Sequence, residues 1–179
     1  MNRAAFLDRD GVLNASIKDQ GIPRPPRSLD EVVILEGVEE AVKLLKLHNF
    51  IPIVISNQPD VARGITTPQK VREINTYIGE KLDIQQFYVC FHDDKDLCVC
   101  RKPLPGLIKS AATQLDLDIS NSFLVGDRWR DIEAGQRSGC KAFFIDYSYL
   151  ETQPESPFTR VSSLLEAVGI MTGANHGTQ

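Results

Sequence analysis

The sequence lacks the features of membrane-spanning and exported proteins. It has no run of about 18 apolar residues, the length that a transmembrane helix requires. The N-terminal segment reaches an acidic residue already at Asp8, too early for the apolar stretch of a signal peptide. We therefore expect a soluble, cytoplasmic protein.

The sequence also has no excess of positive charge. The chain carries 20 Lys and Arg against 24 Asp and Glu, a formal net charge of −4 at pH 7. Proteins that bind nucleic acid or anionic membranes through charge are usually basic. We therefore expect no nucleic-acid partner and no membrane partner.

Internal repeats and linkers are absent as well, and 179 residues fit one globular domain. We place this domain at residues 1–171. The remaining residues, 172–179, are small and polar and are predicted to form a disordered tail. A monomer is expected, because every apolar stripe can be buried within one stack of sheet and helices.

What the sequence does contain is an alternation of short apolar runs with helical patterns. The runs show no polar alternation, which is typical of parallel strands buried on both faces; they lie at 4–7, 51–55, 87–89, 122–125 and 142–145. Apolar residues at helical spacing separate them, at 38–45, 68–82, 107–115, 132–135 and 161–168. The pattern predicts an α/β fold with a doubly wound, mainly parallel sheet and helices on both faces. Residues 14–29 and 90–105 do not fit the alternation and are predicted to be loops.

The first apolar run leads directly into Asp8-Arg9-Asp10-Gly11. Two acids one residue apart at the end of a strand can direct one carboxylate to a metal and the other to a substrate. Asp and Gly are also common turn residues, so this motif alone is equally compatible with a solvated turn.

Three distant segments favour a site. Ser56-Asn57 follows the second run, Arg101-Lys102 precedes the third helix, and Asp127 follows the fourth run. Ligands of such sheets bind beyond the carboxyl ends of the strands, so we expect these side chains in one crevice. Together they offer carboxylates, a hydroxyl and a fixed cation, the groups that phosphoryl transfer through an aspartyl phosphate requires.

These segments, in this order, closely resemble the haloacid dehalogenase superfamily of phosphohydrolases. The resemblance runs from about residue 6 to residue 145 and implies a role for each motif residue. Asp8 would be the nucleophile, and Asp10 the general acid and then the general base. Ser56 and Lys102 would hold the oxygens of the transferred phosphoryl group.

The same resemblance implies a magnesium ion. Its ligands would be the Asp8 carboxylate, the Asp10 backbone carbonyl and Asp127, with Asp131 in the second coordination sphere. Elementary electrostatics agrees, because several acids in one crevice repel each other unless a divalent cation neutralises them, and oxygen ligands favour Mg2+.

Three of the four cysteines are clustered with a histidine: Cys90, His92, Cys98 and Cys100. A chain of this size without an export signal does not need disulfides. The cluster is a complete Cys3His set for tetrahedral zinc, so we predict a structural zinc site in a loop at 90–103. The alternative is one buried cysteine, Cys90, and unrelated thiols in a loop.

A cysteine loop that ends in Arg101-Lys102-Pro103 resembles a subgroup of the superfamily, the D-glycero-D-manno-heptose 1,7-bisphosphate phosphatases and the related histidinol-phosphate phosphatases. Asn57, Arg101 and Arg128 would then contact the substrate, a small phosphorylated metabolite. No segment is long enough for a cap domain. In these relatives the second motif commonly reads Thr-Asn-Gln-Ser-Gly, whereas Pro59-Asp60 ends it here.

Three functions stay open at this point. A Mg2+-dependent phosphatase acting on a sugar bisphosphate such as heptose 1,7-bisphosphate is the main hypothesis. Histidinol phosphate is the alternative substrate. A non-catalytic, zinc-stabilised binding domain is the alternative from another class of protein.

Overall fold

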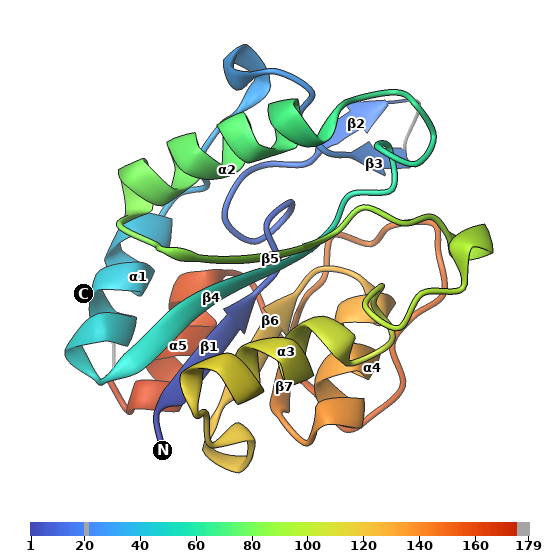
Figure 1. The fold of residues 1–179 in the computed structure, drawn as a ribbon. Helices are drawn as coiled ribbons and strands as arrows, with labels where there is room; N and C mark the ends of the chain where they lie inside the picture. Colours follow the sequence, from blue (N-terminus) through green and yellow to red (C-terminus); the bar gives the residue numbers. More distant parts are fainter. Residues whose placement is uncertain (20–21, 175–179) are drawn as a thin grey trace.

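A computed structural model describes residues 1–19 and 22–174 of the chain. A six-stranded sheet in the order β5-β4-β1-β6-β7-β8 forms its centre, and each neighbouring pair of strands is parallel (Figure 1). The strands are β1 (Arg3–Leu7), β4 (Phe50–Asn57), β5 (Gln86–Cys90), β6 (Phe123–Gly126), β7 (Lys141–Ile145) and β8 (Thr159–Val161). The predicted doubly wound α/β fold is thereby confirmed.

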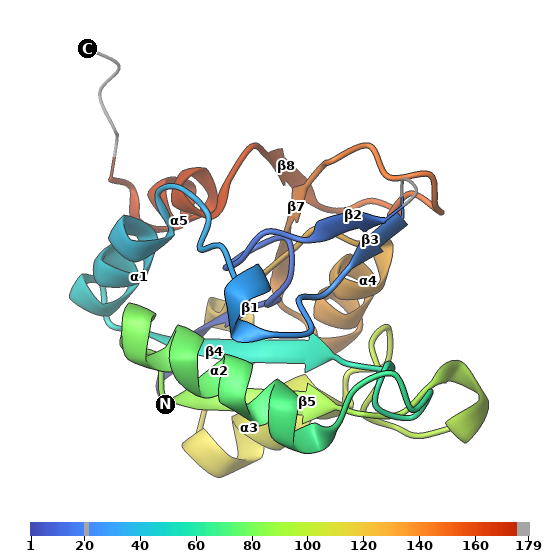
Figure 2. The same ribbon diagram turned by 90° about the horizontal axis from the view of Figure 1, so that it is seen from above.

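Helices cover both faces of the sheet, with α1 and α5 on one side and α3 and α4 on the other (Figure 2). The helices are α1 (Val38–Leu47), α2 (Pro68–Leu82), α3 (Gly106–Leu115), α4 (Trp129–Ser138) and α5 (Leu164–Thr172), with short 3-10 helices η1 (Leu29–Glu31), η2 (Asp94–Asp96) and η3 (Ile119–Asn121). Ala5 and Leu7 of β1 pack in the core with α1, α2 and α5, while Ala4 and Phe6 pack in the core with α3 and α4. Both faces of the strand are buried, which is why its sequence shows no polar alternation.

Two segments differ from the sequence prediction. Val161 was assigned to the last helix, but it lies in β8 opposite Ile145, and α5 begins only after Ser163, whose side chain accepts a hydrogen bond from the Glu166 amide. Within the predicted loop 14–29, β2 (Ile17–Asp19) and β3 (Ile22–Arg24) pair as an antiparallel hairpin. Strands of three residues are too short to produce a recognisable periodicity.

The tail predicted at residues 172–179 begins within a helix end of the structure. Thr172 is the last residue of α5 and Gly173 caps that helix with a positive φ of 70°, so residues 172–173 belong to a helix end. Residues 175–179 of the predicted tail lie outside the described residues. The domain bounds 1–171 stay a prediction.

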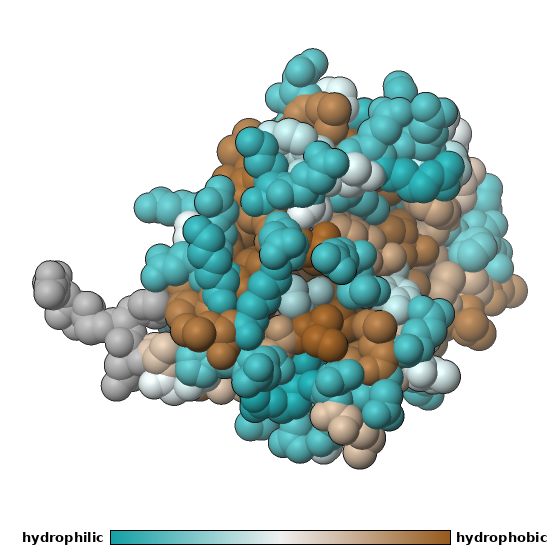
Figure 3. Space-filling model, turned by 60° about the vertical axis from the view of Figure 1, so that its left-hand side comes forward, coloured by the Kyte–Doolittle hydropathy of each residue, from teal (hydrophilic) through white to brown (hydrophobic). Residues whose placement is uncertain are grey.

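Among the described residues, no helix is both long and apolar enough to cross a membrane. Hydrophilic side chains cover much of the face shown in Figure 3, with smaller apolar areas between them.

Candidate active site and metal centre

A pocket of about 640 Å³ opens at the carboxyl ends of the central strands. Parallel strands that leave the sheet at one edge deliver their following residues to a common crevice. The sequence-predicted residues that line the pocket come from four separate segments: Asp8, Asp10, Asn57, Arg101, Lys102, Asp127, Arg128 and Asp131. Residues 22–25 and Arg27, from the segment that follows Asp10, also line the pocket.

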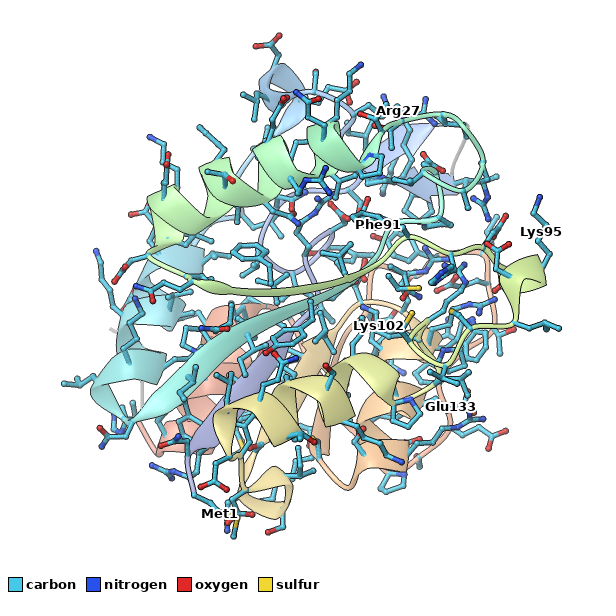
Figure 4. All side chains as sticks on the ribbon, viewed as in Figure 1. Met1, Arg27, Phe91, Lys95, Lys102 and Glu133 are labelled. Carbon is cyan, nitrogen blue, oxygen red and sulfur yellow. The ribbon has the colours of Figure 1, made fainter. Side chains whose placement is uncertain are left out.

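Lys102 lies at the centre of the polar cluster and is 2% exposed. Its Nζ atom lies 2.8 Å from Asp8 Oδ1 and 2.6 Å from Asp131 Oδ1, and it also donates to the Ile55 carbonyl at 2.9 Å. Figure 4 shows Lys102 near the sulfur atoms of the cysteine loop that precedes it. The buried ammonium thus connects the ends of β1, β4 and the start of α4.

The charges of this cluster do not cancel. The carboxylate oxygens of Asp8, Asp127 and Asp131 come within 4.8 Å of one another, and Lys102 pairs with two of these residues. Burial and the charge of Asp131 raise the pKa of Asp8 to about 7 against the opposing effect of Lys102. Burial, with Asp8 and Asp131 nearby, also raises the pKa of Asp127 well above its ordinary value. When all three carboxylates are ionised, they and the one ammonium leave two negative charges, which a divalent cation would neutralise.

Lys102 keeps its positive charge in this setting. Burial by itself lowers the pKa of a lysine, but the neighbouring Asp131 and Asp8 raise it above the ordinary value. The charged ammonium beside the Asp8 carboxylate thus places a positive charge at the pocket that it lines.

The oxygens of Asp127 have different surroundings. Oδ2 accepts a hydrogen bond from the Tyr149 hydroxyl at 3.0 Å, while Oδ1 is buried without a hydrogen-bond partner in the described part of the chain. Asp131 is fully engaged, because Oδ1 pairs with Lys102 and Oδ2 accepts from the Arg128 amide at 2.9 Å. A buried carboxylate oxygen without a partner is costly, and a cation would satisfy it. The residues present therefore fit a Mg2+ ion bound to Asp127 directly, with Asp131 farther out.

A network of side chains holds the Asp10 carboxylate. Arg9 donates to both Asp10 oxygens at 3.1 Å, and Asn14 and Gln58 donate to them at 3.0 and 2.8 Å. Arg9 is completely buried and also donates to Asn75 of α2 at 2.8 Å. Sequence reasoning missed Arg9, Asn14, Gln58 and Asn75. An arginine between two aspartates was a visible signal for Arg9, but nothing local marks Asn75.

Ser56 and Asn57 at the end of β4 have different surroundings. Ser56 is buried, and its hydroxyl accepts a hydrogen bond from Gln58 Nε2 at 2.8 Å. The Asn57 side chain pairs with both backbone groups of Lys102, accepting from its amide at 3.1 Å and donating to its carbonyl at 3.0 Å. In this structure, Asn57 therefore fixes the lysine segment while also lining the pocket.

The two arginines predicted to contact a substrate, Arg101 and Arg128, are paired with acids of the same chain. Arg101 Nε donates to Asp94 at 2.8 Å, and Arg130 donates to the same carboxylate at 3.1 Å. Arg128 Nε donates to Glu151, on the segment after β7, at 2.5 Å.

Asp60, at the position where related motifs carry glycine, also faces the pocket. Its carboxylate lies 3.4 Å from Arg27 and 3.6 Å from Arg63. Arg63 in turn donates to Asp93 of the cysteine loop at 2.8 and 2.7 Å. Arg27 and Arg63, which line the pocket near Asp60, therefore already have acidic partners.

The cysteine cluster has the dimensions of a tetrahedral metal site. The sulfur atoms of Cys90, Cys98 and Cys100 lie 3.2–3.7 Å apart, and His92 Nδ1 lies 3.5 Å from Cys90 and 3.4 Å from Cys100. Zinc with Zn–S bonds of about 2.3 Å places tetrahedral sulfur ligands about 3.8 Å apart, so these residues fit a zinc ion. None of the four cysteines forms a disulfide.

Known proteins resemble this chain along most of its length. Residues 99–156 match the HAD-hydrolase-like family. D-glycero-D-manno-heptose-1,7-bisphosphate 7-phosphatase of Chlorobaculum tepidum is 33% identical over 160 residues, which are 80% of this chain and 78% of that protein. D-glycero-beta-D-manno-heptose-1,7-bisphosphate 7-phosphatase of Haemophilus ducreyi is 30% identical over 151 residues, 78% of this chain and 80% of that protein.

A solved structure agrees with these relatives. The crystal structure of D,D-heptose 1,7-bisphosphate phosphatase from B. bronchiseptica, complexed with magnesium and phosphate, matches with a TM-score of 0.84 at 26% identity. The match covers 94% of this chain and 97% of that chain.

Proposed function

Because this chain belongs to the D-glycero-D-manno-heptose-1,7-bisphosphate 7-phosphatases, a family of HAD-like hydrolases, we propose that it is a Mg2+-dependent phosphatase that hydrolyses the 7-phosphate of a heptose 1,7-bisphosphate. The observation that carries the proposal is the contact of 2.8 Å between the Asp8 carboxylate and the buried ammonium of Lys102. It places a nucleophile beside a fixed positive charge in a pocket large enough for a sugar phosphate.

In this proposal the Asp8 carboxylate attacks the phosphorus atom and forms an aspartyl phosphate as the sugar oxygen leaves. Asp10 gives a proton to that oxygen, and then accepts one from the water that hydrolyses the intermediate to inorganic phosphate. Arg9 and Gln58 hold the Asp10 carboxylate in place through the hydrogen bonds described above. Lys102 and the Ser56 hydroxyl would hold the phosphoryl oxygens during both steps.

Mg2+ would be held by the Asp8 carboxylate, the Asp10 backbone carbonyl and Asp127, with Asp131 in the second coordination sphere. When bound, it would neutralise negative charge between Asp8 and the phosphoryl group. The unpartnered Oδ1 atom of Asp127 and the uncompensated charge of the carboxylates support this assignment.

Zinc is the second metal of the proposal, bound by Cys90, His92, Cys98 and Cys100. Four protein ligands leave no open position, so its role would be structural. The acids of this loop contact the arginines of the pocket wall, and Asp94 contacts two of them, Arg101 and Arg130. A fixed loop would therefore present Arg101 and Arg130 to the substrate, which Arg128 and Asn57 would contact from other segments.

The experiment that tests the function measures inorganic phosphate released by the purified protein from heptose 1,7-bisphosphate and from histidinol phosphate. We expect Mg2+-dependent turnover of the bisphosphate, heptose 1-phosphate as product, and little turnover of histidinol phosphate. Asp8→Asn, which keeps the size of the side chain, should abolish release without changing the circular dichroism spectrum.

Other outcomes would redirect the assignment. A preference for histidinol phosphate would make histidinol phosphate the assigned substrate. Inactivity towards every phosphomonoester in the presence of Mg2+ would favour the non-catalytic binding domain. Turnover by Asp8→Asn close to the unmodified rate would refute the nucleophile.

We further propose that the protein acts as a monomer in the cytoplasm. Four free cysteines are consistent with a reducing compartment.

A further inference from the structure

The segment after β7 returns over the carboxylate cluster. Its Tyr149 hydroxyl donates to Asp127 Oδ2 at 3.0 Å, and its Tyr147 hydroxyl donates to the Gly11 carbonyl at 2.9 Å. The two rings lie 5.6 Å apart, and Glu151 anchors the same segment through Arg128. None of these acceptors is on a neighbouring turn of the chain, so tertiary structure alone creates these contacts.

Gly11, which accepts the hydrogen bond from Tyr147, lies against the same Asp127 carboxylate that Tyr149 contacts. It has a positive φ of 88°, and a Cβ atom built on it would lie 2.0 Å from Asp127 Oδ2. Asp127 is thus confined on one side by the Gly11 backbone, which Tyr147 holds, and on another by the Tyr149 hydroxyl. The oxygen that accepts from Tyr149 is fixed, and the other oxygen, Oδ1, is the buried atom without a protein partner in the described part of the chain.

We propose that Tyr149 is a positioning residue for the catalytic divalent cation, and that it acts by orienting Asp127 so that Oδ1 points to the metal. Tyr147 supports this arrangement through Gly11. The inference rests on the proposed function for the identity of the metal ligands. Hydrogen bonds from the outer shell orient ligating carboxylates, and their loss typically weakens metal binding by about 10–100-fold.

The test is a calorimetric titration of Mg2+ into the full-length, zinc-loaded protein and its Tyr149→Phe variant. Phenylalanine keeps the ring and removes the donor, so we expect the dissociation constant for Mg2+ to rise about 10-fold or more. The matched control is Tyr88→Phe, because the Tyr88 hydroxyl donates to Gln114 at 2.8 Å on an exposed surface. That variant should bind Mg2+ as the unmodified protein does.

Kinetics provides a second readout. The Mg2+ concentration for half-maximal phosphate release should rise in Tyr149→Phe, while the rate at saturating Mg2+ should recover most of its original value. Melting temperatures of the zinc-loaded protein without added Mg2+ show whether the variant folds, and if it does not, Tyr147→Phe gives the same test with a smaller expected effect.

Failure of this inference is distinguishable from failure of the proposed function. A Mg2+ dissociation constant within twofold of the unmodified value in the folded variants would overturn the role of Tyr149, whatever the enzyme hydrolyses. An inactive protein whose Mg2+ affinity still falls in Tyr149→Phe would overturn the phosphatase and leave the positioning role intact.

Discussion

At the scale of single residues, the buried Arg9 shows how a cation between two acids serves the site without lining it. Its side chain is inaccessible to solvent, and its hydrogen bonds go to Asp10 and to Asn75 of α2. Burying a charge is tolerable only when it is paired and hydrogen-bonded, which Arg9 achieves through both partners. The residue therefore connects a helix on one face of the sheet to the carboxylate that would exchange protons.

Replacing Arg9 by methionine should destabilise the protein strongly. Removing one partner of a buried ion pair typically costs about 3–5 kcal/mol, and we expect the lower end because the Asp10 side chain is 15% exposed. Urea unfolding without Mg2+ measures the loss. Arg137→Met is the matched control, since its ion pair with Glu133 is exposed and should contribute at most about 1 kcal/mol. Equal losses in the two variants would contradict the structural role of Arg9.

At the scale of elements, residues of the cysteine loop and of β3 line the same pocket. Neither has a large apolar core of its own, and the loop contains η2 as a single 3-10 turn. Short segments of this kind cannot be held by burial alone, so a bound metal is an effective constraint on the loop. Asp93 and Asp94 extend that constraint to Arg63 and Arg101.

This arrangement predicts the reactivity of the four thiols. Native protein should contain about one equivalent of zinc and resist alkylation at pH 8. After a strong chelator removes the metal, Cys98 and Cys100 should react, as counted by mass spectrometry, whereas Cys90, which is buried and whose thiol pKa is raised by that burial, should react much more slowly. Cys140 should react only after denaturation, because burial raises the pKa of its thiol to about 12 and leaves little thiolate.

Matched variants identify the ligands. Cys98→Ser should lose zinc, whereas Cys140→Ser should retain it. Protein that contains no zinc yet keeps its normal fold would refute the structural metal and restore the alternative of unrelated thiols in a loop.

At the scale of the whole molecule, the fold concentrates negative charge at one edge of the sheet. The buried carboxylates Asp8, Asp127 and Asp131 share one ammonium, so the metal-free protein carries an electrostatic cost that Mg2+ removes. Ligands that bind the folded state stabilise it by mass action. The catalytic metal should therefore also be a stabilising ligand.

Mg2+ at 100 times its dissociation constant should stabilise the protein by about 2.7 kcal/mol and raise the melting temperature by roughly 5–10 °C. Asp127→Asn should lose most of this increase, while Asp30→Asn, at an exposed carboxylate, should keep it. At one fixed Mg2+ concentration, the increase should be larger at pH 8 than at pH 6. The pKa of Asp8 is raised to about 7 in the folded state, so protonation stabilises the metal-free protein below that pH and the effect is lost as the pH rises through it. Equal increases for Asp127→Asn and the unmodified protein would contradict the ligand assignment.

The sequence by itself determined the fold class, the strands β1, β4, β5, β6 and β7, the helices α1 to α4, and the residues that meet at the sheet edge. It could do so because buried parallel strands, helical spacing and polar residues at strand ends are local patterns. The predictions for Val161 and for strands β2 and β3 were wrong, because strands of three residues depend on their partners rather than on a sequence period of their own.

Tertiary structure decided the contacts that hold the functional groups. Asn75 reaches Arg9 from 66 residues away, and Tyr149 reaches Asp127 from 22 residues away. The hydrogen bond between Lys102 and Asp8 spans 94 residues. No local pattern encodes such pairs, because which donor meets which acceptor depends on how helices and loops pack around the sheet. The chemical groups of the site were therefore readable from the chain, while their orientation and protonation were set by burial and packing.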